Sequence, residues 1–381
     1  MSNLLTTQVD SNSDVINFGI GQPQMEILPT AEIEQAAAHR LSQQNPFVLA
    51  YGNEAGDGLF RLALAHFLSN RYGEPVDAEQ LVVTAGISQA MDMLCTVLTQ
   101  AGDTVFVEEP TYFLVRQILL DHQLNVVSLP IDENGLMLDA LEEALKEHTP
   151  KFVYTIPTFH NPSTVTMPAE NRKRLVELSQ AHGFYVVADE VYQLLNYGAS
   201  PPAPLAAYVD TGSVISVSSF SKILAPGLRL GWIQTAPEVA DQISGSGMLY
   251  SGGSISHFTS AVVRSALELG LQDQYLAELK RIYGRRVKVM AEAIEAHLPE
   301  ITFACPTGGF FFWLKLPDSV DVDLLREQAV AHKVDFMPGY KASNQDQLHE
   351  YIRLSFAFYD EPTIGAGIER LAAAMKALQL V

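Results

Sequence analysis

The chain has 381 residues, with 44 Asp or Glu against 24 Lys or Arg, so its formal net charge is −20. A surface this acidic repels nucleic acid and anionic membranes, although local arginines can still bind a small anion. A hydrophobic content of 48% at this length is typical of a well-packed soluble enzyme with two domains in close contact.

The cysteines and the uncharged segments indicate a cytoplasmic protein. Cys95 and Cys305 each lie in an apolar segment without the spacing of a zinc site, so we expect two buried free thiols in a reducing compartment. Residues 1–14 have neither the basic start nor the apolar stretch of a secretory signal. Residues 242–263 carry no Asp, Glu, Lys or Arg but are rich in Ser and Gly, so we expect a loop and a helix start rather than a membrane span.

The middle of the chain alternates between short apolar runs and amphipathic stretches. The apolar runs predict strands at residues 80–86, 103–110, 125–130, 151–157, 184–190 and 213–219. The stretches between them predict helices at 88–102, 111–123 and 167–183, with stops at Gly102 and Gly183 and with Pro168 near the third start. Strands that are apolar throughout and alternate with helices form a mostly parallel sheet covered on both faces.

The C-terminal part of the chain has a different pattern. It predicts one long helix at residues 274–298, a strand within 308–317, a helix through 322–333 and a short strand at 351–357. We interpret this part as a smaller α+β domain packed on the large one.

Four residues fall at the carboxyl ends of predicted strands, where open α/β sheets bind ligands: Gly86, Asn161, Asp189 and Lys222. Taken alone, Asp189 can equally be a helix cap or half of a buried salt bridge, and most single lysines are solvated. Together Asp189 and Lys222 indicate a site, because they end different strands about one crossover apart. A desolvated lysine can attack an aldehyde, and a nearby acid can hold a protonated ring nitrogen, which is the pairing that pyridoxal phosphate requires.

Two segments are candidates for binding a phosphate. Gly86 stands at a strand-to-helix turn, and Ile87, Ser88 and Gln89 open the helix, whose first amides are free to bind an anion. A turn of this kind is also common without a ligand. Near Lys222, two hydroxyls and a guanidinium form a plausible second clamp, from Ser219, Ser221 and Arg229.

Five segments resemble motifs of the fold-type I pyridoxal-phosphate aminotransferases of class I/II, and they occur in family order between about residues 16 and 375. The segment "SSFSKILAPGLRLGW" resembles the lysine motif, "VVADEVY" the strand of the ring-nitrogen aspartate, and "TIPTFHNPSTVTM" the Asn-Pro motif. Two further segments, "LAYGNEAGDGLFRLALAHFL" and "YIRLSFA", are similar to the family's Tyr-Gly and carboxylate-arginine motifs. Each motif is weak alone, but the ordered set is specific.

The resemblance implies a fold and an assembly. The fold would have a large domain at residues 46–285, with a mostly parallel, seven-stranded type of sheet covered by helices. The smaller α+β domain would be built from both chain ends, residues 1–45 and 286–381. The assembly would be a homodimer with shared active sites, because Tyr51 would reach the phosphate bound by the neighbouring subunit.

The resemblance also implies a role for each site residue, and it implies no metal. Lys222 would link covalently to the aldehyde of pyridoxal 5′-phosphate and later move the substrate proton, and Asp189 would pair with the ring nitrogen. The other ring contacts would come from Tyr192, Asn161 and Tyr112. The phosphate would be held by Gly86, Ile87, Ser88, Ser219, Ser221, Arg229 and the neighbouring Tyr51. The amino acid substrate would be bound by Arg353, Asn161 and Gly21.

Two departures from the usual motifs refine this expectation. The sequence "NPST" at residues 161–164, after "FH", looks more like the branch near 2-aminoadipate aminotransferases and the aminotransferase-like domains of certain bacterial regulators. The sequence "GISQ" at residues 86–89 replaces a Gly-Ser-Gln-Gln segment, so Ile87 can offer the phosphate only its backbone amide.

The substrate is expected to be a neutral, hydrophobic or aromatic L-amino acid that passes its amino group to a 2-oxo acid. A dicarboxylate needs a second cation, and the segment from Ile16 up to Arg40 contains none, although Arg116 or a partner-chain arginine could substitute. Three alternatives stay open: transamination of 2-aminoadipate or another dicarboxylate, a β-lyase or decarboxylase reaction with the same cofactor, and a non-enzymatic effector-binding module. The last class carries an N-terminal winged helix, whereas 15 residues precede Ile16 here.

Overall fold

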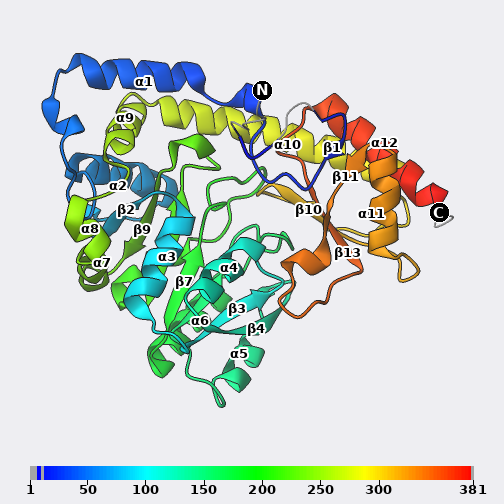
Figure 1. Ribbon diagram of the computed structural model, residues 1–381, viewed down its shortest axis with the longest axis horizontal. Helices are drawn as coiled ribbons and strands as arrows, with labels where there is room; N and C mark the ends of the chain where they lie inside the picture. Colours follow the sequence, from blue (N-terminus) through cyan, green and yellow to red (C-terminus); the bar gives the residue numbers. More distant parts are fainter. Residues whose placement is uncertain (1–6, 10–12, 379–381) are drawn as a thin grey trace, which may run out of the picture.

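The computed structural model describes residues 7–9 and 13–378, so most of the start predicted to lack a signal, residues 1–14, lies outside the described residues. A large sheet with helices on both faces forms one part of the molecule, and the C-terminal helices lie beside it around a small sheet (Figure 1). The predicted fold class, a mostly parallel α/β sheet with a smaller α+β part, is confirmed.

The large sheet has the strand order β2-β9-β8-β7-β6-β3-β4-β5. Its five central strands, from β8 to β4, pair in parallel, whereas β9 runs antiparallel to both of its neighbours and β5 forms a hairpin with β4. The two-residue β5 extends the seven-stranded type that was expected. In spatial order the bounds are Leu81–Thr84, Gly231–Thr235, Val214–Ser219, Tyr185–Asp189, Phe152–Thr155, Thr104–Glu109, Asn125–Asp132 and Gly135–Leu136.

Strand β3 shows how the sheet is covered on both faces. Val105 and Val107 pack into the apolar cluster that contains α3, α4 and α7, whereas Phe106 between them packs with α5 and α6 on the other face. Strands buried on both faces have the continuous apolar runs seen in the sequence. The helices of this part are α2 (Gly58–Tyr72), α3 (Ile87–Leu98), α4 (Phe113–Asp121), α5 (Leu138–Ala144), α6 (Ala169–His182), α7 (Pro237–Ser244), α8 (Gly247–Gly252) and α9 (His257–Glu268).

The smaller part combines segments from both chain ends. Near the N-terminus, β1 (Ile16–Asn17) pairs in parallel with β11 (Val334–Asp335). The small antiparallel sheet has β13 (Tyr351–Ser355) between β10 (Phe311–Lys315) and β12 (Met337–Pro338). The remaining helices are α1 (Thr30–Ser42), α10 (Leu271–His297), α11 (Val322–Ala331) and α12 (Glu361–Ala377), and short 3₁₀ segments occur at Met25–Ile27, Pro46–Leu49, Ala78–Gln80, Leu205–Thr211, Pro226–Leu228 and Gly339–Ala342.

The domain limits at residues 46 and 285 stay a prediction. Helix α10 runs through residue 285 without a break, and α1 packs along α9 (Figure 1). The contact between the two parts matters for function, because it brings β13 and the segment after β1 against the carboxyl ends of the large-sheet strands.

Of the two helix ends predicted from a glycine stop, the one at Gly183 is confirmed and the one at Gly102 is wrong. Helix α6 begins after Pro168 and ends at Gly183, which has the left-handed φ of 75° that favours glycine. The helix predicted at 88–102 instead ends at Leu98, because Thr99 is extended, with φ −131° and ψ 165°. Residues 242–263 are more helical than predicted, since α8 forms between two glycine interruptions.

Two further expectations concern exposure and membranes. Cys95 is buried as expected, but Cys305 is exposed, because it lies in the connection between α10 and β10 and outside both elements. Within the described residues, every helix is too short or too polar to cross a bilayer.

Candidate active site

Lys222 follows β8 and directs its amino group toward the segment after β1. Its Nζ donates a hydrogen bond to the carbonyl oxygen of Gly21 at 2.7 Å and lies 5.5 Å from the centre of the Phe310 ring. Burial, and then the positive charge of Arg353, lower the pKa of Lys222 to about 8, against the opposing effect of Asp189. A lysine with these surroundings is neutral much more often at physiological pH than an exposed one, as a nucleophile must be.

Asp189 ends β7, next to β8 in the sheet, and is 4% exposed. Its carboxylate accepts hydrogen bonds from the Tyr154 hydroxyl at 2.8 Å and from the Val191 amide at 3.3 Å. Burial raises the pKa of Asp189 to about 6, while these two donors oppose the rise. Among the described residues, no cation is bonded to this carboxylate. A protonated ring nitrogen would therefore be a suitable partner for its negative charge.

Tyr154 was not identified from the sequence. It lies in β6, is fully buried, and has a pKa raised far above the usual range by burial and then by the charge of Asp189. A tyrosine inside an apolar parallel strand requires a buried hydrogen-bond partner, and that requirement was the signal available.

Arg353 comes from β13 of the small sheet and meets Asn161 from the loop after β6. Its guanidinium donates to Asn161 Oδ1 at 2.8 Å and to the carbonyl oxygen of Gly19 at 2.9 Å, and it lies 4.0 Å from the centre of the Phe311 ring. The side chain is 3% exposed, and its Nε has no partner within the described ranges. Burial lowers the pKa of Arg353 to about 10. A buried guanidinium bonded only to neutral oxygens is suited to receive a carboxylate.

Gly21 lies between these two cationic side chains. Its carbonyl receives Lys222, and a Cβ added at Gly21 would stand 3.1 Å from Phe311 and 3.8 Å from Arg353 Nη2. The structure therefore brings Gly21, Lys222 and Arg353 together.

Two tyrosines surround the same region. Tyr192 is 3% exposed and packs 5.5 Å from Phe310 and 6.1 Å from Phe311, measured between ring centres. Tyr112 precedes α4, and burial and then the charge of Asp189 raise its pKa to about 12. These contacts form an aromatic lining between the lysine and the arginine.

The phosphate candidates also converge. A Cβ at Gly86 would lie 2.8 Å from Arg229 Nη2, and Gly86 has a φ of 90° that favours glycine. The Nη1 of the same guanidinium lies 3.5 Å from Ser221 Oγ, which in turn accepts from Ser219 Oγ at 2.8 Å. Ile87 and Ser88 form the first turn of α3 beside them. This cradle combines free helix amides, hydroxyls and a cation, the donor set that binds a phosphate group.

Tyr51 differs from the other predicted cofactor contacts, because its side chain is 90% exposed in the single chain. It lies on a groove of about 390 Å³ whose other side is formed by residues 248–257. The single chain does not bring Tyr51 into the buried site.

The donor set fits pyridoxal phosphate. A half-buried amine with a lowered pKa, a buried carboxylate without a bonded cation among the described residues, and a phosphate cradle on Gly86 match its aldehyde, ring nitrogen and phosphate. A separate groove of about 520 Å³ is lined by acidic residues 318, 321, 323 and 350 and by none of the site residues.

Known proteins resemble this chain along nearly its whole length. The family model for aminotransferase class I and II matches residues 13–371. The aromatic-amino-acid aminotransferase 1 of Thermococcus litoralis is 34% identical over 370 residues, which cover 96% of this chain and 88% of that protein.

Two crystal structures share the fold. The multiple substrate aminotransferase from Thermococcus profundus has a TM-score of 0.90 at 33% identity, covering 97% of this chain and 94% of that one. The α-aminoadipate aminotransferase from Thermus thermophilus, complexed with N-(5′-phosphopyridoxyl)-L-leucine, has a TM-score of 0.87 at 29% identity with the same coverages, 97% and 94%.

Proposed function

The chain belongs to the class I and II aminotransferases, and from this membership we propose how its residues divide the reaction and which donors it accepts. The enzyme is a pyridoxal-phosphate-dependent aminotransferase, as the sequence predicted. The observation that carries the assignment of roles is the meeting of Lys222, Asp189 and Arg353 around one aromatic-lined site.

Pyridoxal phosphate supplies, when bound, an aldehyde that joins to amines and a ring that accepts electron density from the substrate Cα. Lys222 would hold the aldehyde of the cofactor, and its free Nζ would move the proton at the substrate Cα. Asp189 keeps a proton on the ring nitrogen, and Tyr154 fixes the orientation of the Asp189 carboxylate. Asn161, Tyr192 and Tyr112 would contact the ring.

Arg353 binds the α-carboxylate of the amino acid. Without substrate, the buried guanidinium is bonded only to the neutral oxygens of Asn161 and Gly19. A planar carboxylate would gain two parallel hydrogen bonds from it. Asn161 positions the guanidinium by accepting its hydrogen bond, and the Gly21 carbonyl positions the amino group of Lys222 in the same way.

The donor is a neutral amino acid with a hydrophobic or aromatic side chain. The lining consists of Phe310, Phe311 and the two tyrosines, and the segment over the site carries Gln22 and Gln24 where a cation for a distal carboxylate would be needed. Gln24 accepts a hydrogen bond from Arg286 of α10, whose guanidinium lies 5.8 Å from the centre of the Tyr283 ring. The similarity to the aromatic-amino-acid aminotransferase 1 of Thermococcus litoralis supports the same donor class.

We expect phenylalanine, tyrosine, leucine or methionine to exceed glutamate and 2-aminoadipate in kcat/KM by about 100-fold or more, because an unpaired carboxylate in an apolar lining is costly. Steady-state kinetics with a fixed 2-oxo acid and a panel of donors measures this ratio. Glutamate or 2-aminoadipate at the head of the panel would overturn the donor class and leave the assignment of Lys222 intact.

The cofactor-free enzyme is expected to capture pyridoxal phosphate at a rate that rises with pH, is half-maximal near pH 8 and levels off above it. Only neutral Lys222 attacks the aldehyde, and burial lowers its pKa from the ordinary 10.5 to about 8, so the neutral fraction saturates at lower pH than for an exposed lysine. Stopped-flow absorbance across about pH 6 to 11 measures the profile. A rate that continues to rise toward pH 10.5, the ordinary pKa, would mean that Lys222 is not desolvated.

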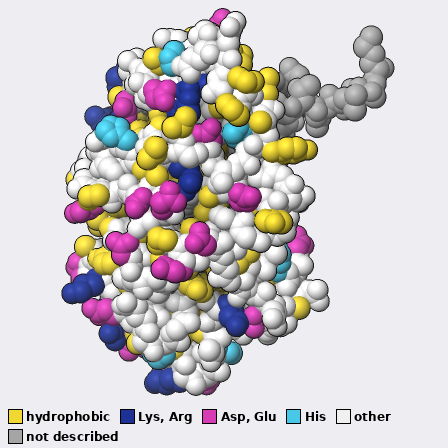
Figure 2. All heavy atoms as spheres, turned by 90° about the vertical axis from the view of Figure 1, so that its left-hand side faces the viewer, with side chains coloured by type: hydrophobic (Ala, Val, Ile, Leu, Met, Phe, Trp, Pro, Cys, Tyr) yellow, Lys and Arg dark blue, Asp and Glu magenta, His cyan; other side chains and the backbone are white. Residues whose placement is uncertain are grey.

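The enzyme functions as a homodimer with shared active sites. Apolar side chains are exposed on the face turned toward the viewer in Figure 2. In the groove of Tyr51 and in the chain segments that form it, the most exposed large apolar side chains are Phe47, Leu49, Tyr51, Tyr250 and Ile255. The 90% exposure of the Tyr51 side chain supports its proposed role of reaching the site of a second chain. Light scattering that gives a monomer at micromolar concentration would contradict this assembly.

The cytoplasmic location of the enzyme stays a prediction.

A further inference from the structure

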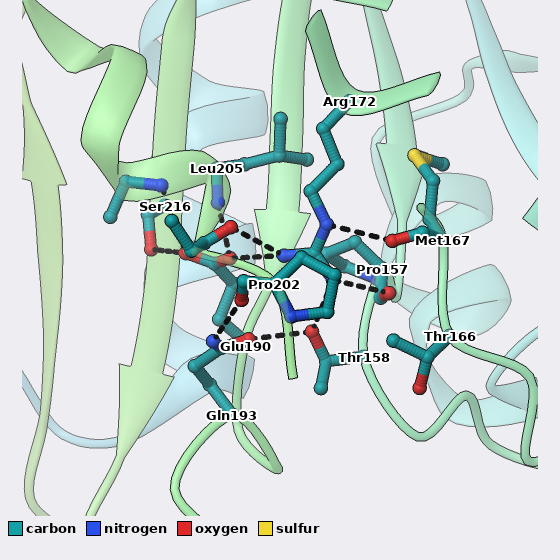
Figure 3. A network of polar contacts seen from close by, with 12 residues as sticks. Pro157, Thr158, Thr166, Met167, Arg172, Glu190, Gln193, Pro202, Leu205 and Ser216 are labelled. Atoms are coloured by element: carbon teal, nitrogen blue, oxygen red, sulfur yellow. Dashed lines mark hydrogen bonds and ion pairs between the residues drawn. The ribbon is translucent and has the colours of Figure 1, made fainter. Parts of the chain in front are cut away.

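One buried arginine connects several segments that carry site residues without being a site residue itself. Arg172 of α6 is 1% exposed, and its guanidinium donates to four oxygens: the carbonyls of Pro157, Met167 and Ala203 at 2.9, 3.0 and 2.9 Å, and Thr158 Oγ1 at 2.8 Å. Figure 3 shows the guanidinium between the loop of Pro157 and Met167 and the carboxylate of Glu190.

The acceptors of Arg172 include the two ends of the loop that carries Asn161. Pro157 and Met167 are also bonded to each other, since the Met167 amide donates to the Pro157 carbonyl at 2.8 Å. Arg172 therefore closes the base of this loop.

The ion-pair partner of Arg172 is Glu190, the residue directly after Asp189. The two side chains approach to 4.0 Å, and Glu190 accepts from the Leu205 and Ala206 amides at 2.6 and 3.1 Å and from Ser216 Oγ at 2.7 Å. Burial lowers the pKa of Arg172 and raises that of Glu190, and each charge opposes the shift of the other. The pair thus connects α6 with the end of β7, and the Ser216 hydrogen bond connects Glu190 to β8, the strand that leads to Lys222.

A hydroxyl extends the network to the turn of Tyr192. Thr158 Oγ1 accepts from Arg172 and donates to Gln193 Oε1 at 2.5 Å, and Gln193 donates on to the Pro202 carbonyl at 2.9 Å. Gln193 is the neighbour of Tyr192, so Thr158 joins the Asn161 loop to this turn.

We propose that Arg172, Glu190 and Thr158 are positioning residues for transamination, because their buried network fixes the segments of Asn161, Asp189 and Tyr192 relative to one another. This inference rests on the proposed roles of those three residues. A buried ion pair is a weak source of stability compared with apolar packing, and one that joins several segments is better explained by the geometry that it imposes.

The test compares two variants, each with a matched control. Arg172→Lys keeps the positive charge but loses the planar guanidinium with its several donors. Its control is Arg174→Lys, at a half-exposed position two residues further along α6. Thr158→Val removes one hydroxyl with nearly the same shape retained, with Thr235→Val as its control. Thr235 is also fully buried and donates to a carbonyl, that of Val214, at the opposite end of β8 from Ser219.

We expect kcat to fall about 100-fold in Arg172→Lys and about 10-fold in Thr158→Val, measured well below the unfolding midpoint, with both controls unchanged. The dissociation constant of pyridoxal phosphate, titrated into the cofactor-free protein, should rise about 10-fold in Arg172→Lys. The visible circular dichroism of the bound cofactor, which reports its orientation, should change in both variants.

If Thr158→Val matches Thr235→Val in kcat and in circular dichroism, the network serves packing alone and the inference is overturned. Thr158→Val also decides the case if Arg172→Lys fails to fold. A wild-type enzyme that binds the cofactor but transaminates no donor would instead contradict the proposed function, and the binding and circular dichroism comparison would still test the positioning role.

Discussion

Replacing Lys222 by alanine is expected to lower kcat for transamination by about 10⁴-fold or more. The variant loses both the amine that holds the cofactor aldehyde and the base that moves the proton at the substrate Cα. Its surroundings show why another group cannot take over: the amino group lies between the Gly21 carbonyl and the Phe310 ring, neither of which can act as a base. Single-turnover kinetics at saturating pyridoxal phosphate measure the loss.

The matched control is Lys280→Ala. Lys280 is also half-buried, donates to one neutral acceptor, Asn196 Oδ1 at 2.7 Å, and has a pKa lowered by burial. It lies on α10, outside the site, so we expect wild-type kcat. Equal activity of the Lys222 and Lys280 variants would remove Lys222 from the mechanism.

Replacing Arg353 by methionine is expected to lower kcat/KM for every amino acid donor by about 10³-fold, since the donor loses two hydrogen bonds to a charged group, each contributing about 1.5–3 kcal/mol. The loss should fall on donor binding and not on the cofactor, because Arg353 bonds Asn161 and Gly19 and lies away from the phosphate cradle of Gly86. Initial rates at varied donor concentration, together with a cofactor titration, separate the two.

Arg370→Met is the control for this variant. Arg370 lies partly exposed on α12 and donates to the Lys333 carbonyl at 3.0 Å, so its loss should leave kcat/KM unchanged. An Arg353→Met enzyme with normal donor kinetics, or one whose defect is explained entirely by lost cofactor, would assign the carboxylate to another residue.

The local sequence predicted the fold wherever burial imposed a simple pattern. Strands β3, β7 and β8 are continuous apolar runs because both of their faces are covered, and α6 carries its own start and stop residues. Residues at the ends of such strands could be grouped into one site, since parallel strands meet at one edge. Lys222 and Asp189 were found in this way.

Contacts between segments that are distant in the sequence could not be predicted from local sequence patterns. The arginine of β13 meets Asn161 only because the small sheet packs against the large one, and Arg172 gave no sign in the sequence of α6 that it faces Glu190. Exposure of Cys305 likewise depends on a connection whose path the sequence does not determine. Tyr154 is the exception, because its hydroxyl in an apolar strand required a partner that could have been sought at the neighbouring strand end.

The most direct test of the central claim is the visible absorption spectrum of the purified enzyme with pyridoxal phosphate, before and after an amino acid donor is added without any 2-oxo acid. The account predicts a band from the lysine-linked cofactor that bleaches as the amino group is transferred, and that is absent from Lys222→Ala. A band that persists unchanged with every donor, or one that Lys222→Ala retains, would contradict it.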